Sequence, residues 1–114
     1  MDNNCIFCKI IAGKIPCDKV YEDEHAIAFK DIKPVAPVHI LIVPKKHVAS
    51  LNDLTTVDLK MMPHLFHVVQ QVATQTGVAT TGYRTIINTG RESGQEVFHL
   101  HVHIIGGKRC GAMG

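Results

Sequence analysis

Near its end the chain alternates histidine with apolar residues, from Phe98 to Ile105. Because successive side chains of a β-strand point to opposite faces, this alternation predicts a strand over 97–105 that carries a row of imidazoles. The imidazole face holds His99, His101 and His103, and the core face holds Phe98, Leu100, Val102 and Ile104. Such a row can bind a metal ion, or it can do nucleophilic and acid/base chemistry, since free imidazole titrates at about pH 6.5.

The rest of the sequence predicts short strands and one long helix. Thr55 and Asp58 have the spacing of a capping box, and apolar residues at helical intervals follow up to Gly77. Pro63 has no N–H to donate, so it predicts a kink or a broken first turn in this helix. Periodicity adds a short helix and further strands, over 5–12 and over 19–22, 25–31, 38–43 and 83–88. We therefore expect an α+β fold in which about five antiparallel strands form a sheet, with one long and one short helix. The long helix should cover one face and leave the histidine face open to a ligand.

Size and charge narrow the class of protein. The chain has 114 residues, 46% of them hydrophobic, which suits one compact domain, 1–114. Its formal charge is +2 and its basic residues are scattered, which argues against nucleic acid as a partner. No stretch approaches the ~18 apolar residues that span a bilayer, and the first residues do not resemble a secretion signal. We expect a cytoplasmic protein with no membrane attachment.

Two cysteines near the N-terminus, Cys5 and Cys8, have the spacing Cys-x-x-Cys. In a reducing compartment such a pair indicates a zinc site or a redox pair more often than a structural disulfide. A redox pair usually lies between a strand and a helix, and we expect no strand before Cys5, which favours zinc. A tetrahedral zinc needs two further ligands. Cys17 and Cys110 have no obvious partner.

The motif His-x-His-x-His-x-x over 99–105 resembles the signature of the histidine triad (HIT) family. Other segments are similar to its Hint branch, the nucleoside phosphoramidases, and these are 5–11, 29–34, 36–47, 82–84, Asn88 and 93–95. The resemblance covers nearly the whole chain. It implies a HIT-like fold and a homodimer, in which the long helix and the strand near 83–88 join two sheets into a ten-stranded one.

The resemblance also implies a reaction. Hint proteins bind purine nucleoside 5′-monophosphate derivatives, and a histidine attacks the α-phosphorus to form a nucleotidyl-histidine that water hydrolyses. By that match His101 is the nucleophile, and His103 holds a phosphate oxygen or passes a proton to the leaving amine. His39 matches an additional active-site histidine with a supporting role. The expected substrates are adenosine or guanosine 5′-phosphoramidates, with nucleotidylated lysine and aminoacyl adenylates as further candidates.

The same match implies a nucleotide-binding site. Asp31 resembles the carboxylate that accepts both ribose hydroxyls. The loop 89–96 contains glycines, which let backbone N–H groups approach a phosphate. Glu96 stands where relatives often carry serine or threonine, so we expect it to contact the ligand through its backbone or to turn away. The apolar slot for the base comprises Ile6, Phe7, Ile10, Phe29 and Ile32. The other nucleotide-binding residues implied by the match comprise Asn88, Gly94, Gln95, Glu96, Val97, His101 and His103, of which Asn88, Gly94 and Gln95 match phosphate contacts of the family.

The resemblance to zinc-containing relatives also implies the two further ligands of the metal site. Their match assigns a structural Zn²⁺ to Cys5, Cys8, His47 and His99. The phosphoryl chemistry itself then requires no metal. Three other hypotheses stay open: a nucleotide-binding regulatory module, a dinucleoside polyphosphate hydrolase, and a catalytic metal site formed by the histidine row.

Overall fold

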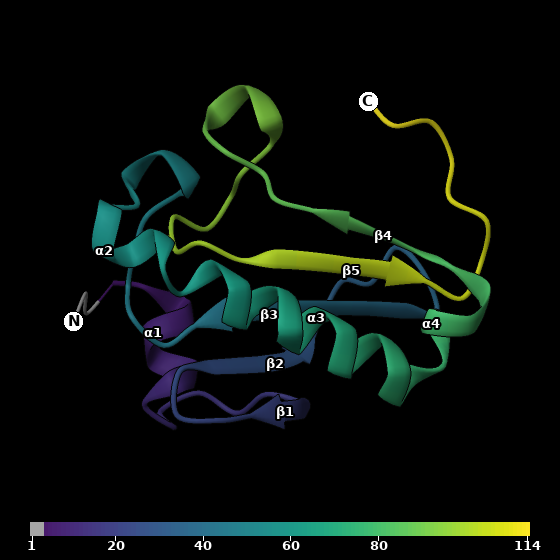
Figure 1. The fold of residues 1–114 in the computed structure, drawn as a ribbon, viewed down its shortest axis with the longest axis horizontal. Coiled ribbons are helices and arrows are strands. Elements are labelled where there is room, and N and C mark those ends of the chain that lie inside the picture. The colour runs from purple at the N-terminus through teal and green to yellow at the C-terminus, as the bar shows by residue number, and fades with distance from the viewer. Residues whose placement is uncertain (1–3) are drawn as a thin grey trace.

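One sheet contains all the strands of the described residues, and every neighbouring pair in it is antiparallel (Figure 1). The computed structural model describes residues 4–114, so positions 1–3 of the predicted domain lie outside the described residues. The strands are β1 (Lys19–Glu22), β2 (Ala26–Lys30), β3 (Val38–Pro44), β4 (Tyr83–Ile86) and β5 (Val102–Gly106), in the order β1-β2-β3-β5-β4. The predicted α+β fold with a five-stranded antiparallel sheet is confirmed. Within 4–114, no helix has the length and hydropathy needed to cross a membrane.

Two short helices add to the predicted pair. The described α-helices are α1 (Ile6–Ile11), α2 (Thr56–Leu59), α3 (Met62–Thr76) and α4 (Val78–Thr81), and two 3-10 helices are η1 (Leu51–Asp53) and η2 (Arg91–Ser93). The capping box is present and starts α2: the N–H of Asp58 donates to Thr55 Oγ1, and the N–H of Thr55 donates to the Asp58 carboxylate, both at 3.1 Å. Pro63 lies in the first turn of α3, where its missing N–H breaks no helical hydrogen bond. The break predicted from this proline therefore separates α2 from α3.

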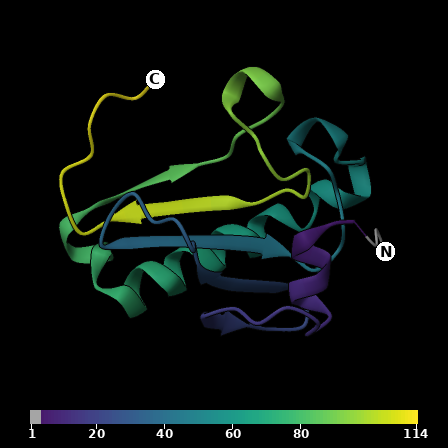
Figure 2. The same ribbon diagram turned by 180° about the vertical axis from the view of Figure 1, so that it is seen from behind.

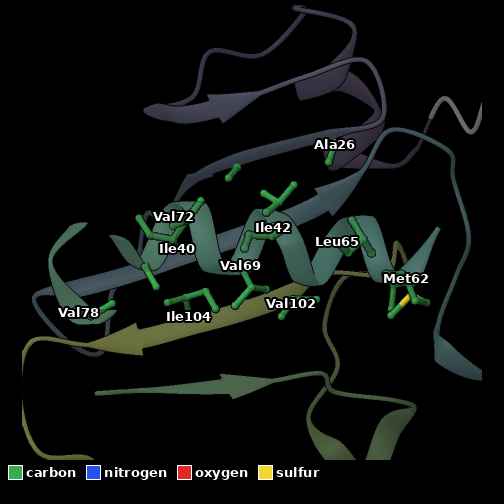
Figure 3. Packing of buried hydrophobic residues seen from close by; sticks show 14 residues of the cluster. Ala26, Ile40, Ile42, Met62, Leu65, Val69, Val72, Val78, Val102 and Ile104 are labelled. Carbon is green, nitrogen blue, oxygen red and sulfur yellow. The ribbon is translucent and has the colours of Figure 1, made fainter. Parts of the chain in front are cut away.

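The two faces of the sheet carry cores of different size. On one face α3 packs its apolar side chains onto β2, β3 and β5, as Ile40, Leu65 and Val72 show in Figure 3. On the other face α1 covers one end of the sheet (Figure 2). The buried residues of this second cluster are Cys5, Phe7, Cys8, Ile27, Phe29, Leu41 and Val43. His39 and His103 lie on this second face, beyond the part that α1 covers.

The histidine segment differs from its prediction, because only its second half is a strand. β5 begins at Val102, whose partner on β3 is Ile42. Before this point the N–H of Leu100 donates to the carbonyl of Val48, 2.7 Å away, and not to a neighbouring strand. Leu100, Val102 and Ile104 are buried as predicted, but the prediction for Phe98 is wrong, since its side chain is 52% exposed. His99 and His101 therefore precede the strand that was expected to carry them.

Gly106, the last residue of β5, lies where no side chain fits. A Cβ at this position would come within 2.7 Å of Val78 Cγ1 and 3.3 Å of Tyr83 Cβ. We expect Gly106→Ala to lower the free energy of unfolding by about 1–3 kcal/mol, the usual cost of overpacking, in urea titrations. Gly111→Ala is the matched control, because a Cβ there meets nothing within 4 Å. Equal stability of Gly106→Ala and the parent would show that α4 shifts freely away from β5.

Candidate functional site

The ring of His101 is held by a single backbone hydrogen bond. Its Nδ1 lies 2.7 Å from the carbonyl oxygen of His99, and since a carbonyl only accepts, Nδ1 carries the proton. The ring is 7% exposed, with Phe7 edge-on at 5.1 Å between ring centroids. Burial lowers the pKa of His101, which favours the neutral ring. His101 therefore presents an unprotonated Nε2, the form in which imidazole is a nucleophile.

Two further histidines form a chain of hydrogen bonds beside it. The N–H of Val35 donates to Nδ1 of His39 at 3.2 Å, so the proton of the neutral His39 ring is on Nε2. That nitrogen lies 2.9 Å from Nδ1 of His103 and donates to it. The proton of His103 is consequently on Nε2. Asp31 Oδ2 lies 3.4 Å from His39 Nε2, at the edge of the same group. The backbone of the loop 31–37 thus sets the tautomers of both rings.

A second group of side chains, which we call the Cys/His cluster, lies at the other end of the histidine segment. It comprises Cys5, Cys8, His47 and His99, whose candidate ligand atoms all lie within 4.8 Å of one another. Nδ1 of His99 is 3.3 Å from Cys5 Sγ and 3.1 Å from His47 Nδ1. Cys8 Sγ is 3.3 Å from His47 Nδ1. The structure therefore brings together all four residues that the resemblance assigned to the metal.

The chemistry of this donor set fits a tetrahedral metal ion. Bond lengths of about 2.3 Å to sulfur and about 2.0 Å to nitrogen place tetrahedral donors roughly 3.3–3.8 Å apart, close to the separations found. His99 donates from Nε2 to the carbonyl of Pro44 at 2.8 Å, which leaves its Nδ1 unprotonated and facing the cluster. Burial also lowers the pKa of His99 and favours the neutral ring that a metal needs. With four protein donors the site is closed, as structural metal sites are.

Known proteins are similar to this chain in sequence and fold along nearly its whole length. The family model described as scavenger mRNA decapping enzyme C-term binding matches residues 4–112. The purine nucleoside phosphoramidase of Escherichia coli strain K12 is 43% identical over 113 residues, 99% of this chain and 95% of that protein. A solved histidine triad protein of Clostridium difficile is 46% identical, with a TM-score of 0.96 over 100% of this chain and 99% of that one. The chain belongs to the histidine triad family.

A HIT family hydrolase of Clostridium thermocellum is a further solved relative. It is 43% identical, with a TM-score of 0.95, and the match covers 99% of this chain and 98% of that one. The protein is accordingly a HIT family hydrolase.

The residues expected to form the base slot of this HIT protein are placed unequally. Phe7 and Phe29 are buried and contact each other edge to face, with ring centroids 5.5 Å apart. Ile10 is half-buried, and Ile6 is 42% exposed on the outer side of α1. Ile32 is 89% exposed, which leaves its side chain free of the core. The two phenylalanines are thus core residues of the smaller cluster as well as candidates for the slot.

The predicted phosphate loop is held together by Gln95. Its Oε1 accepts from the N–H of Gly90 at 2.9 Å, and its Nε2 donates to the carbonyls of Ala49 and Val97 at 2.9 and 3.1 Å. These bonds use the buried side chain internally, and the N–H of Gln95 also donates within the loop, to the carbonyl of Gly90 at 3.3 Å. Around it, Asn88 and Val97 are half-buried, and Gly94 and Glu96 are exposed.

His103 makes the stability of the protein depend on pH. Burial lowers its pKa to about 4, with His101 and His39 contributing, whereas an unfolded histidine titrates at about 6.5. Between these values the unfolded chain binds a proton that the folded protein does not. The free energy of unfolding should therefore rise with pH across this range, by up to about 1.4 kcal/mol per pH unit from this group, and level off above it. Urea titrations at several pH values measure the slope. His103→Gln should reduce the slope to the part that comes from the lowered pKa values of His99 and His101, and an unchanged slope in that variant would contradict this assignment.

Sequence reasoning missed the backbone groups of the site. The N–H of Val35, the carbonyl of Pro44 and the carbonyl of His99 each fix one imidazole. Every residue carries such groups, so the identity of these residues gives no signal. Pro44 gives an indirect signal, because a proline at the end of a strand has a carbonyl that accepts a hydrogen bond but no N–H that donates one.

Proposed function

We propose that this protein hydrolyses purine nucleoside 5′-phosphoramidates through a covalent nucleotidyl-histidine at His101. The observation that carries the proposal is the hydrogen bond from His101 Nδ1 to the His99 carbonyl, which leaves Nε2 as a free nucleophile. A relative 43% identical over 99% of this chain is named a purine nucleoside phosphoramidase, which supports the substrate class.

The proposed reaction has two displacements at the α-phosphorus. In the first, Nε2 of His101 forms a bond to phosphorus and the P–N bond breaks. A bound phosphoryl anion favours protonated His103, which gives its proton to the departing amine. In the second, water attacks the same phosphorus, the bond to His101 breaks, and His103 takes up the proton of the water. The carbonyl of His99 stabilises the positive charge that His101 carries while it is nucleotidylated.

We propose that the nucleotide lies along the open part of the face beside α1. We propose that Asp31, half-buried at the end of β2, accepts the ribose hydroxyls. The base would lie against Phe7 and the apolar residues near it, with Phe29 behind. The remaining nucleotide contacts are proposed from the loop that Gln95 organises and from Asn88.

We also propose that the ion of the Cys/His cluster is zinc and that it is structural. A bound zinc supplies a cross-link between α1 and the segments that carry His47 and His99. We propose a cytoplasmic location, because cysteines that hold a metal persist as thiolates in a reducing compartment. A homodimer fits the two surfaces that the family resemblance names, because β4 is an edge strand and Phe66 on α3 is 48% exposed.

A panel of substrates tests the proposed function. The protein is incubated with adenosine and guanosine 5′-phosphoramidates, diadenosine polyphosphates and AMP, and products are separated by chromatography. The expected result is release of AMP or GMP together with the amine. Binding of AMP without turnover of any substrate would favour a regulatory nucleotide-binding module. Faster cleavage of the diadenosine compounds would assign the protein to the polyphosphate hydrolases.

A further inference from the structure

The candidate nucleophile stands outside the hydrogen-bonded ladder of the sheet. The pairing of β5 with β3 begins at Val102, and its pairing with β4 begins at His103. His101 is the residue before this point, so strand pairing holds neither its backbone nor its ring. A nucleophile needs a fixed direction, because an error of about 1 Å can cost about 100-fold in rate. Other contacts have to supply that rigidity.

One such contact is the ring of His103, 5.0 Å from that of His101 between centroids, and the others lead to the Cys/His cluster. His99 contributes its side chain to the cluster and its carbonyl to His101 Nδ1, so one residue serves both. The N–H of Leu100, between them, donates to the carbonyl of Val48, which directly follows the cluster residue His47. Phe7 lies in α1 between Cys5 and Cys8, and its ring contacts the rings of both His101 and His99. Three separate links therefore join the cluster to the nucleophile.

We propose that the Cys/His cluster, when its four residues share a metal ion, positions His101 for attack. Its residues are positioning residues, since none of them contacts the substrate in the proposed reaction. They fix the His99 carbonyl on one side of the His101 ring and Phe7 on the other. The metal-bound cluster thus does for His101 what strand pairing does for His103. The kinetic test of this inference rests on the proposed function. The spectroscopic test rests on the structure alone.

The test compares the metal-loaded protein with the same protein after removal of the metal by a chelator. We expect removal to lower kcat for adenosine 5′-phosphoramidate by about 100-fold, with a much smaller change in KM and in the Kd of AMP, because Phe7 alone among the proposed nucleotide contacts depends directly on the cluster. In long-range ¹H–¹⁵N spectra His101 should lose the pattern of a single tautomer protonated on Nδ1. Zn²⁺ and Cd²⁺ should restore kcat and the spectrum equally well, because both complete the cluster and neither takes part in the reaction.

Cys5→Ser provides a variant whose local fold is protected. Cys5 is the N-cap of α1 and accepts from the N–H of Cys8, a role that serine fills well, while its thiolate is lost. It should reproduce the loss of kcat and the change in the His101 spectrum. Cys17→Ser makes the same chemical change outside the cluster and should match the parent.

Each other outcome overturns the inference in its own way. An unchanged kcat and an unchanged His101 spectrum after metal removal would show that the cluster does not position His101. Loss of AMP binding together with kcat would show that the metal supports the whole fold and not the nucleophile. A kcat that follows the identity of the added ion would make the metal catalytic. If the loaded protein cleaves no phosphoramidate, the proposed function fails, and the spectra alone then decide whether the cluster positions His101.

Discussion

His101→Ala is expected to lower kcat for adenosine 5′-phosphoramidate by a factor on the order of 10³ or more. The variant has no Nε2 to bond to phosphorus, and His103 cannot replace it, because its own Nε2 carries a proton. The affinity for AMP should change far less, since the proposed ribose and base contacts are intact. Loss of the nucleophile alone is therefore expected to lower kcat and to preserve AMP binding.

Mass spectrometry of protein quenched during turnover provides the direct measurement. The parent should carry one adenylyl group on His101, and His101→Ala should carry none. His25→Ala is the matched control, because His25 is exposed and its ring contacts only the ring of His64 among the aromatic pairs described. Turnover at the parental rate in His101→Ala would remove this residue from the role of nucleophile.

His39→Leu should lower kcat by about 10- to 100-fold. His39 is buried and donates from Nε2 to Nδ1 of His103, so leucine leaves that acceptor without a partner. An unsatisfied buried group costs about 1–3 kcal/mol, and each 1.4 kcal/mol is a factor of about ten in rate. His103 is then free to adopt the other tautomer, with its proton on Nδ1 and none directed at the phosphate.

His39→Gln separates this role from simple packing. The glutamine amide can place an N–H near the former position of Nε2, so it should recover much of the kcat that His39→Leu loses. Steady-state kinetics measure both variants, and ¹⁵N spectra report the tautomer of His103. Equal loss in the two variants, with an unchanged His103 spectrum, would show that His39 only fills space.

Local chemistry predicted much of the fold. The capping box at Thr55 and the break at Pro63 were readable because each depends on one residue type and its near neighbours. The alternation also identified the buried residues Leu100, Val102 and Ile104. The start of β5 was not readable in this way, because the bond between Leu100 and Val48 joins segments that are distant in sequence. The alternation of apolar residues with histidine extends over 97–101, but the structure has no strand over these residues.

In the candidate site too, local sequence patterns predicted some of the residues and missed others. The spacing of Cys5 and Cys8 pointed to a metal, whereas His47 and His99 entered only through the resemblance to a family. The structure then placed the four donor groups together. The roles of the two nitrogens in His39 and His101 could not be predicted, since they depend on which backbone carbonyl or N–H lies beside each ring.

The smaller core beneath α1 has a consequence for the stability of this helix. Partial unfolding in native proteins begins where little apolar surface is buried, and without a bound metal that region is α1 with Phe7 beside His101. A metal ion on the Cys/His cluster would tie α1 to the segments that carry His47 and His99. Local opening of α1 is therefore expected to depend on the metal, whereas global denaturation depends mainly on the larger core under α3.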